Sequence, residues 1–332
     1  MAQVSVIIVN YNGRHFLGEC FGSLARQIRP ADEVILVDNA STDGSVDYTR
    51  EHFPWVKVVA SETNTGFAEG NNLGLAQAQG DYLALLNNDT EVDEGWLEEL
   101  VRTLDADGQV GAAVSKIYLA SSYPTLDCAG AEFNNLGFCW GRGSNQLDRG
   151  QFDTASEVPA VTACAMLLRR EALGGAPLFD ERLFMYYEEF DLSLRLRGRR
   201  YAIVYVPTAV VYHKRSEGVK GATRKPVLFQ QFYGNRNRVK ILFKYYPPAV
   251  LLRSLPLIFL SLAYWDGVFL RDGGWAFFAR AVVGQVRYAW QGLRERLRGD
   301  AGVEAKHWLP WMTNQGLREV LALKSALGAY VK

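Results

Sequence analysis

The chain begins with four short apolar runs, VSVIIV (Val4–Val9), EVILVD (Glu33–Asp38), VKVVA (Val56–Ala60) and YLALL (Tyr82–Leu86). The segments between these runs have helical patterns. The first of them places four apolar residues on one face, namely Leu17, Cys20, Phe21 and Leu24. Strands that alternate with helices are typical of a parallel sheet whose connections cross over through the helices. We therefore predict an α/β fold with a mainly parallel sheet flanked by helices.

Length and composition limit the class of protein. The chain has 332 residues, of which 48% are hydrophobic, so it can bury a full core and has room for one large domain with an appendage. The four cysteines form no CxxC pair, which indicates neither a zinc site nor a disulfide framework and favours a reducing compartment. The run at residues 4–9 is too short for a signal peptide. We expect this part of the chain to stay in the cytoplasm.

Charge is distributed unevenly along the sequence. Residues 1–200 contain 16 Lys and Arg against 29 Asp and Glu, whereas residues 201–300 contain 16 against 5, and the whole chain has a net charge of zero. An acidic first part and a basic second part suggest two tasks. The basic part could meet phosphate groups on a small ligand or on a lipid surface, and we expect no nucleic acid partner.

The composition changes after Phe243 to Leu, Phe, Trp and Arg. The apolar run at residues 249–265 contains Arg253 and Pro256, and its 17 residues fall short of the roughly 20 that a membrane-spanning helix needs. Basic residues among aromatic and aliphatic ones are typical of a helix that lies in the plane of an anionic membrane surface. We predict a helical, amphipathic, membrane-associating appendage. The alternative is a helical hairpin packed on the main domain or on a second subunit, and the second arrangement would make a homodimer.

Polar residues follow three of the predicted strands, as Asn10-Tyr11-Asn12, as residues 38–43 (DNASTD) and as Asn87-Asn88-Asp89. Open parallel sheets bind ligands at the carboxyl ends of their strands, so we expect a site at this edge. Asp38 could accept hydrogen bonds from a base or a ribose, although it could also cap the next helix, a role that suits Asp43 as well. Asp89 could hold a divalent metal that bridges to a diphosphate, although Asn-Asn-Asp is also common in turns. Neither GxGxxG nor GxxxxGK[ST] is present, which argues against a dinucleotide cofactor or ATP.

A second acidic cluster, Glu188, Glu189 and Asp191, follows the aromatic-rich run FMYY at residues 184–187. Apolar surroundings raise the pKa of a carboxyl group, which suits a general base near neutral pH. On a helix over residues 188–197, Glu188 and Asp191 share a face while Glu189 points elsewhere. The alternative is a solvated helix start, because acidic residues are favoured at the positive end of a helix.

His213 closes a predicted strand at residues 210–213, after another at residues 202–206. A single histidine is more often structural than a ligand, but an imidazole at a strand end could complete a metal site. The basic loop that follows could neutralise phosphate oxygens through Lys214, Arg215, Lys220 and Arg224.

Taken together, these segments resemble glycosyltransferase family 2, in particular its bacterial rhamnosyltransferase-like branch. The resemblance covers roughly residues 3–245. Seven segments carry it: VSVIIVNYNG (4–13), ILVDNASTDGS (35–45), NTGFAEGNNLGL (64–75), GDYLALLNNDTEV (80–92), LFMYYEEFDLSLRLRGRRY (183–201), VYHKRSEG (211–218) and YGNRNRVKILFKYYP (233–247). It implies a GT-A type, Rossmann-like catalytic domain at residues 1–242, with a nucleotide-sugar half (1–115), an acceptor half (116–242) and a helical C-terminal region (243–332).

The resemblance also implies roles for single residues. Those implied to contact the nucleoside-diphosphate sugar are Tyr11, Asp38, Asn64, Gly66, Asn72, Asn88, Arg236 and Asn237. The DxD motif of the family falls on residues 87–89, where Asn87 replaces the first acid, so that Asp89 remains the main metal ligand with His213 as its partner. The base of the family falls on Glu189, where many relatives have Asp. This difference leaves Glu188 as the other candidate, with Asp191 in support.

The implied reaction is the inverting transfer of rhamnose or a similar hexose from a dTDP- or UDP-sugar to a hydroxyl of a saccharide or lipid-linked acceptor. It would serve cell-surface polysaccharide synthesis at the inner face of the cell membrane. A divalent metal, Mg²⁺ or Mn²⁺, and basic groups would stabilise the leaving diphosphate while the base deprotonates the acceptor.

Two other functions remain as alternatives. A nucleotidyltransferase would carry a loop rich in Gly and basic residues after the first strand, where this chain has only Gly13 and Arg14. A non-catalytic, membrane-associated scaffold with a decayed site is suggested by Asn87 alone.

Overall fold

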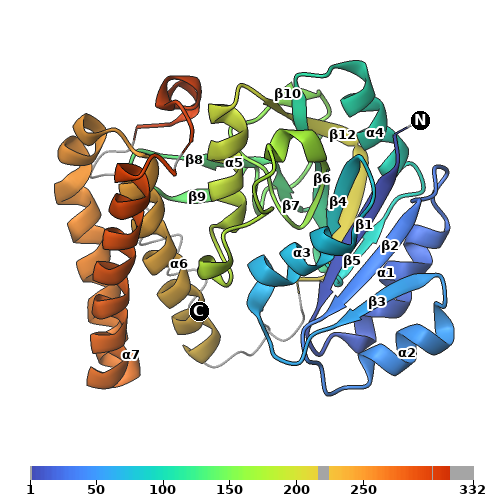
Figure 1. Ribbon diagram of the computed structural model, residues 1–332, viewed down its shortest axis with the longest axis horizontal. Helices are drawn as coiled ribbons and strands as arrows, with labels where there is room; N and C mark the ends of the chain where they lie inside the picture. The colour runs from blue at the N-terminus through green and yellow to red at the C-terminus, as the bar shows by residue number, and fades with distance from the viewer. Residues whose placement is uncertain (1, 216–223, 301, 315–332) are drawn as a thin grey trace.

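The computed structural model describes residues 2–215, 224–300 and 302–314. A ten-stranded mixed sheet forms its centre (Figure 1), in the order β10-β12-β6-β11-β4-β1-β2-β3, with β5 paired to β12 and β7 paired to β6. The strands are β1 (Val4–Asn10), β2 (Glu33–Asp38), β3 (Val56–Ala60), β4 (Tyr82–Leu86), β5 (Thr90–Val92), β6 (Val110–Leu119), β7 (Leu126–Ala129), β10 (Ser156–Glu157), β11 (Ala165–Arg169) and β12 (Ala202–His213). Two further strands, β8 (Ala131–Phe133) and β9 (Cys139–Gly141), form a separate hairpin.

The direction of the strands brings several chain segments to one edge. Strands β1 to β4 pair in parallel, and β6 pairs in parallel with β12. Between these two groups, β11 is antiparallel to both β4 and β6. The carboxyl ends of β1, β2, β4 and β12 therefore lie at the same edge of the sheet.

Helices cover both faces of the sheet. The helices are α1 (Arg14–Ala25), α2 (Ser45–His52), α3 (Gly66–Gln77), α4 (Trp96–Ala106), α5 (Glu188–Gly198), α6 (Arg224–Tyr245) and α7 (Pro248–Leu297). Alternate residues of β1 face opposite sides, so that Val6 packs in one core with α1 and α4, and Ile7 packs in a second core with α3 and α5. These two cores fix the sheet edge that carries the candidate site.

The structure confirms the predicted fold class and the four opening strands, and the mainly parallel sheet has one antiparallel insertion. The two strands predicted at residues 202–206 and 210–213 are one strand, β12, with an irregular register between Val206 and Val210. Strand β6, which is buried along nearly its whole length, is not predicted from the sequence. Its small residues, such as Gly111 and Ala112, give no clear period in the sequence.

The C-terminal helices form a layer at the end of the molecule away from β3 (Figure 1). Helix α7 is broken at Gly274, whose φ of +77° and ψ of 176° are not helical. Its two arms, arm 1 (248–273) and arm 2 (275–297), lie side by side (Figure 1). Gln285 of arm 2 donates to Asp266 Oδ1 of arm 1 at 2.9 Å. Helix α6 packs against both arms and continues through the predicted boundary at residue 242. The predicted helical appendage is present, and it packs on the main domain.

Candidate active site

Hydrogen bonds join the ends of three strands at the carboxyl edge of the sheet. Asn88 Nδ2 donates to Asn10 Oδ1 at 2.7 Å, and Asn10 Nδ2 donates to Asp38 Oδ2 at 3.0 Å. The other oxygen of Asp38 accepts the backbone N–H of Ser41 at 2.9 Å. Asn10 and Asp38 are both buried. These bonds hold the predicted donor residues Asp38 and Asn88 on either side of Asn10, because β1 lies between β2 and β4 in the sheet.

The predicted metal ligands lie together at this edge. Antiparallel pairing of β5 with β12 places His213 opposite Thr90, next to Asp89. The backbone N–H of Lys214 donates to the carbonyl of Asp89 at 2.9 Å, and Asp89 Oδ1 is 3.2 Å from His213 Nε2. Both side chains are largely buried, with 11% and 12% of their surface exposed. The main chain of two paired strands therefore holds the carboxylate and the imidazole together.

A third residue, Asp127 on β7, orients the imidazole. Its Oδ2 is 2.5 Å from His213 Nδ1, and its other oxygen pairs with Arg215. A carboxylate on one ring nitrogen is the usual way in which a metal-binding histidine is fixed, with the other nitrogen presented to the metal. Asp127 is not predicted as a site residue from the sequence, because it lies in a four-residue strand that carries no recognisable motif.

The pair fits a hard divalent cation. Mg²⁺ and Mn²⁺ accept carboxylate and imidazole ligands and commonly take the rest from substrate phosphates and water. Among the residues that the structure describes, no three His, Cys, Asp or Glu side chains form a larger metal site. A cation held by Asp89 and His213 would therefore take its remaining ligands from oxygens of the donor and from water.

The backbone just before α5 is strained. We call residues 183–187 the strained turn, because Phe184 (φ +66°, ψ −63°), Tyr186 (φ +67°) and Tyr187 (φ +73°) all have positive φ. The N–H of Met185 donates to the carbonyl of Leu183 at 2.8 Å and closes a γ-turn around Phe184. Each such conformation in a residue other than glycine costs on the order of 1–3 kcal/mol, and it persists where the surroundings hold it. The strained turn leads directly into Glu188.

Residues 64–72 carry the predicted donor residues Asn64, Gly66 and Asn72, and this segment, which we call the donor loop, contacts the strained turn. The N–H of Ala68, in the first turn of α3, donates to the carbonyl of Phe184 at 3.0 Å. Gly66 has a φ of +83°, and a Cβ built on it would lie 2.5 Å from the ring and the carbonyl oxygen of Phe184. Asn64 accepts the N–H of Gly66 at 3.0 Å, and Asn39 donates to the carbonyl of Gly66 at 2.8 Å. The donor loop and the strained turn thus meet at Gly66.

The two acids at the start of α5 have different surroundings. Glu188 is 5% exposed, and its Oε2 atom is buried without a hydrogen-bond partner among the described residues. Glu189 is half-buried. Burial raises the pKa of both carboxyl groups, and the charge of Glu189 raises the pKa of Glu188 further. A carboxylate with a raised pKa can take a proton near neutral pH, and the greater accessibility of Glu189 supports the prediction that it is the base.

Asp191 connects α5 to α6. Its carboxylate accepts hydrogen bonds from Arg195 Nε at 2.9 Å, Lys244 Nζ at 3.0 Å and the hydroxyl of Tyr245 at 2.8 Å. Burial opposes the ionisation of Asp191, but the charges of Lys244 and Arg195 outweigh it and lower the pKa. Asp191 therefore supports the acids through the fold of the helix that carries them.

Three predicted donor residues bind backbone groups of the acceptor half. The amide of Asn237 donates to three carbonyls of the strained turn, and the guanidinium of Arg236 donates to the carbonyl of Leu183 at 2.9 Å. Asn72 exchanges two hydrogen bonds with the backbone of Phe179, at 2.9 and 3.0 Å. These bonds fix the segment before α5, and contact of the three side chains with the donor stays a prediction.

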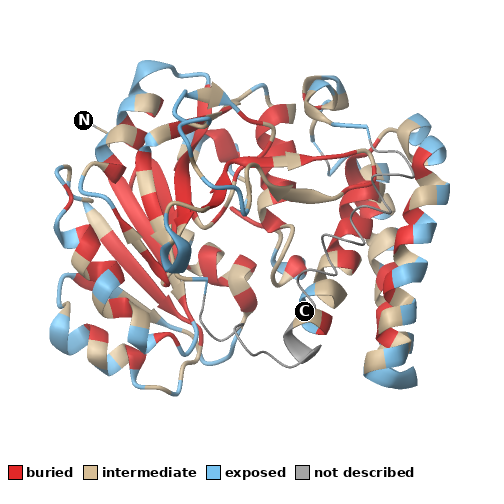
Figure 2. Ribbon diagram, turned by 180° about the vertical axis from the view of Figure 1, so that it is seen from behind, coloured by how far each residue is buried: buried red, intermediate tan, exposed pale blue. Residues whose placement is uncertain are grey.

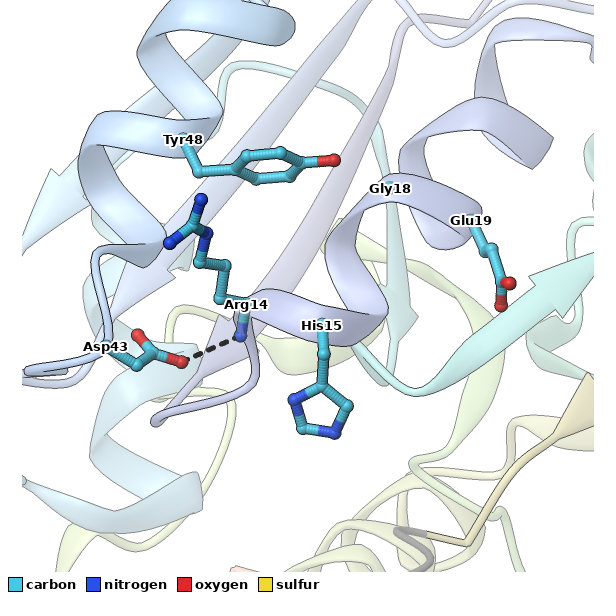
Figure 3. Close-up of a pocket in the computed structure, with 6 residues that line it drawn as sticks. All are labelled: Arg14, His15, Gly18, Glu19, Asp43 and Tyr48. Atoms are coloured by element: carbon cyan, nitrogen blue, oxygen red, sulfur yellow. Dashed lines mark hydrogen bonds between the residues drawn. The ribbon is translucent and has the colours of Figure 1, made fainter.

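A separate hollow of about 420 Å³ lies between the first turns of α1 and α2 (Figure 3), lined by Arg14, His15, Gly18, Glu19, Asp43 and Tyr48. The guanidinium of Arg14 lies over the ring of Tyr48, 5.3 Å from its centroid. Asp43 accepts the N–H groups of Arg14 and Ser45, the first residues of α1 and α2, which is the structural role that its position suggests. Tyr11 is exposed just beyond β1. The hollow contains none of the predicted site residues.

Comparison with known proteins gives relatives of one kind. The chain is 28% identical over 233 residues to the N-acetylglucosaminyl-diphospho-decaprenol L-rhamnosyltransferase of Mycobacterium tuberculosis. This match covers 64% of this chain and 76% of that protein. The chain is also 30% identical over 224 residues to an O-antigen biosynthesis protein of Myxococcus xanthus. This second match covers 64% of this chain and 17% of that larger protein.

Two solved structures share the fold. GalNAc-T7 with UDP, GalNAc and Mn²⁺ has a TM-score of 0.61 and 20% identity, and the match covers 75% of this chain and 49% of that one. A mannosyltransferase from Pyrobaculum calidifontis, in complex with GDP-Man and Mn²⁺, has a TM-score of 0.53 and 18% identity over 92% and 87% of the two chains. Both are GT-A glycosyltransferases, so the predicted GT-A fold is confirmed. The family model for glycosyl transferase family 2 matches residues 5–174. Since that match spans more than half of the 332 residues, the chain belongs to glycosyl transferase family 2.

Proposed function

We propose that this protein is a metal-dependent, inverting hexosyltransferase of cell-surface polysaccharide synthesis. It would move rhamnose or a similar sugar from a dTDP- or UDP-sugar to a hydroxyl of a lipid-linked saccharide. The observation that carries the proposal is the 3.2 Å approach of Asp89 to His213 at the sheet edge that also holds Asp38 and Asn88. The name of the mycobacterial relative supports the choice of sugar and of a lipid-linked acceptor.

The chemistry follows from the placement of the residues. A divalent cation on Asp89 and His213 would offset the charge of the departing diphosphate. Glu189 takes the proton of the acceptor hydroxyl while the hydroxyl oxygen bonds to the anomeric carbon and the bond to the diphosphate breaks. One displacement inverts the configuration, so the mechanism needs no nucleophilic side chain and no covalent sugar intermediate. The contact of Gly66 with Phe184 ties the donor loop to the acids.

The outer face of the helical hairpin supports a location at the inner face of the membrane. Figure 2 shows exposed residues along both arms, and the large apolar ones are Leu252, Phe259, Leu260, Tyr264, Trp275, Val283, Val286, Trp290 and Leu297. The exposed charges among them are arginines, whereas Asp266 bonds Gln285, Asp272 pairs with Arg271, and Glu295 is buried. Apolar and cationic side chains on one face match an anionic lipid surface. Helix α7 is also long and apolar enough to cross a membrane by length and composition alone.

The test is a panel of nucleotide sugars incubated with the full chain, a short prenyl-diphosphate-linked N-acetylglucosamine and Mn²⁺. We expect release of nucleoside diphosphate with dTDP-rhamnose or a UDP-hexose, a new inverted linkage in the product, and loss of both with a chelator. Pyrophosphate release from a nucleoside triphosphate would instead support a nucleotidyltransferase. No binding of any nucleotide would support the scaffold.

A further inference from the structure

The strained turn is held from outside its own segment, and one side chain of α6 bonds three of its carbonyls. Asn237 is fully buried, and its Nδ2 donates to the carbonyls of Leu183 at 2.9 Å, Met185 at 3.0 Å and Tyr186 at 2.8 Å. Two N–H bonds serve three acceptors, so the amide sits at the centre of the turn. Its Oδ1 accepts the Nε of Arg236 at 3.0 Å, which fixes which way the amide faces.

Arm 2 of the hairpin reaches the same backbone. The hydroxyl of Tyr288 donates to the carbonyl of Arg182 at 2.6 Å. The guanidinium of Arg236 lies over the rings of Tyr233 and Tyr288, 4.5 and 4.1 Å from their centroids, and donates to Leu183. Arg236 is thereby held between α6 and arm 2, with its fork aimed at the start of the strained turn.

Ion pairs repeat this connection. Glu295 of arm 2 pairs with Arg182 at 2.8 Å, Lys240 at 3.1 Å and Lys244 at 3.3 Å. Lys244 in turn pairs with Asp191 of α5 at 3.0 Å. The helical layer therefore contacts the chain just before the strained turn, at Arg182, and one helical turn after it, at Asp191.

We propose that Asn237, Arg236 and Tyr288 are positioning residues for the acids at the start of α5, so that the helical layer is part of the transfer machinery as well as an attachment. The inference rests on the proposed function, in which one of these acids is the base. Three positive φ values before Glu188 are unfavourable unless the turn is held. If the turn relaxes, Tyr187 rotates and the acids move away from the reacting hydroxyl, and a displacement of about 1 Å is enough to slow a reaction roughly 10²-fold. The strand ends that carry the donor residues are untouched.

Two variants test the proposal in the full-length protein. Asn237→Leu keeps the size of the side chain and removes its three hydrogen bonds to the strained turn. Tyr288→Phe removes one hydroxyl and keeps the ring under Arg236. We expect kcat to fall on the order of 10²-fold for Asn237→Leu and several-fold for Tyr288→Phe, with the Kd for nucleoside diphosphate and Mn²⁺ unchanged within about twofold. An unchanged Kd in the Asn237 variant would assign this side chain to positioning and not to the predicted contact with the donor. Tyr123→Phe is the matched control, because it removes the same hydroxyl from an exposed tyrosine outside the helical layer.

Hydrogen exchange of the backbone amides at residues 184–190 provides a second readout that needs no activity. We expect faster exchange there in Asn237→Leu and Tyr288→Phe than in the native protein, and native rates in β1 to β4. Should Asn237→Leu fail to fold, Tyr288→Phe carries the test. Native kcat together with native exchange in Tyr288→Phe overturns the proposal. A loss of kcat that equals the fraction of unfolded protein in the variant overturns it as well. A native protein that transfers no sugar refutes the proposed function instead, and the exchange rates still decide whether the helical layer holds the turn.

Discussion

Asp89 and His213 approach to 3.2 Å although they lie far apart in the sequence, because β5 follows Asp89 directly and pairs with the last residues of β12. The contact is therefore set by main-chain hydrogen bonds, and Asp127 adds a side-chain restraint on the imidazole. A metal site built from this pair would be formed before the donor binds, and it would lose little conformational freedom when the donor arrives.

Removal of the Asp89 carboxylate should abolish transfer. We expect Asp89→Ala to lower kcat/KM by at least roughly 10²-fold, because the charge of the diphosphate leaving group is no longer offset. Initial rates of nucleoside-diphosphate release measured over a range of Mn²⁺ concentrations check this. Normal turnover by the variant, or full activity of the native enzyme in chelator, would show that the metal site is misassigned.

Substitution of the base should separate chemistry from binding. Glu189→Gln keeps the shape of the side chain but cannot accept a proton, so we expect transfer to fall by roughly 10²-fold or more with donor binding near native, and Glu188→Gln to do less. If Glu188→Gln is inactive and Glu189→Gln is not, the base is Glu188. If both are active, the acids only begin a helix.

The acidic side of the pH profile should report the same group. A base must be deprotonated to act, and burial raises the pKa of Glu189. We therefore expect kcat of the native enzyme to fall as the pH drops through this raised pKa, at a higher pH than the value of about 4.3 for an ordinary glutamate. The residual activity of Glu189→Gln should lack this dependence. A native profile that stays flat down to pH 4.5 would contradict the assignment.

Loss of the Asp191 charge should destabilise the fold. Asp191→Asn leaves Arg195 buried without its counter-ion and Lys244 with Glu295 alone, and we expect the free energy of unfolding at pH 7 to fall by about 3–5 kcal/mol. The pKa of Asp191 is lowered in the folded state, so its contribution is present above the unfolded value of about 3.9 and is lost as the pH falls below that value. Urea unfolding of both proteins at pH 7 and pH 3.5 tests this, and a difference that grows in acid would be the wrong sign.

A methyl group at Gly66 should separate the donor loop from the strained turn. Gly66→Ala places a Cβ against the carbonyl of Phe184 and forces alanine into a φ of +83°. We expect stability to fall by roughly 1–3 kcal/mol and transfer to fall more than stability explains. Gly95→Ala is the control, because a Cβ there would meet nothing within 4 Å and its φ of −89° is ordinary. Equal behaviour of the two variants in thermal unfolding and transfer would rule out a special role for this contact.

The sequence predicts the parts of the site that follow from strand ends and from motifs. The runs before Asn10, Asp38 and Asn88 are apolar and strand-like, so the sequence predicts that these polar residues lie at one edge of the sheet. Asp127 and Tyr288 act through tertiary contacts that leave no period or spacing in the sequence. The resemblance located Asn237, but as a donor contact, and its bonds to the strained turn also leave no trace in the sequence. The strained turn was also hidden, because FMYY contains no glycine, and aromatic residues with positive φ go against local preference.

The irregular register of β12 decides which way His213 faces. Val206 pairs with Ser115 and Val210 with the next residue, Lys116, so residues 207–209 have no partner on β6. Val206 and Val210 are four residues apart and would face the same side of a regular strand, but their two partners are adjacent and face opposite sides of the sheet. The unpaired residues therefore exchange the two sides of β12 for everything after them. In an unbroken strand His213 would face the other side of the sheet, away from Asp89.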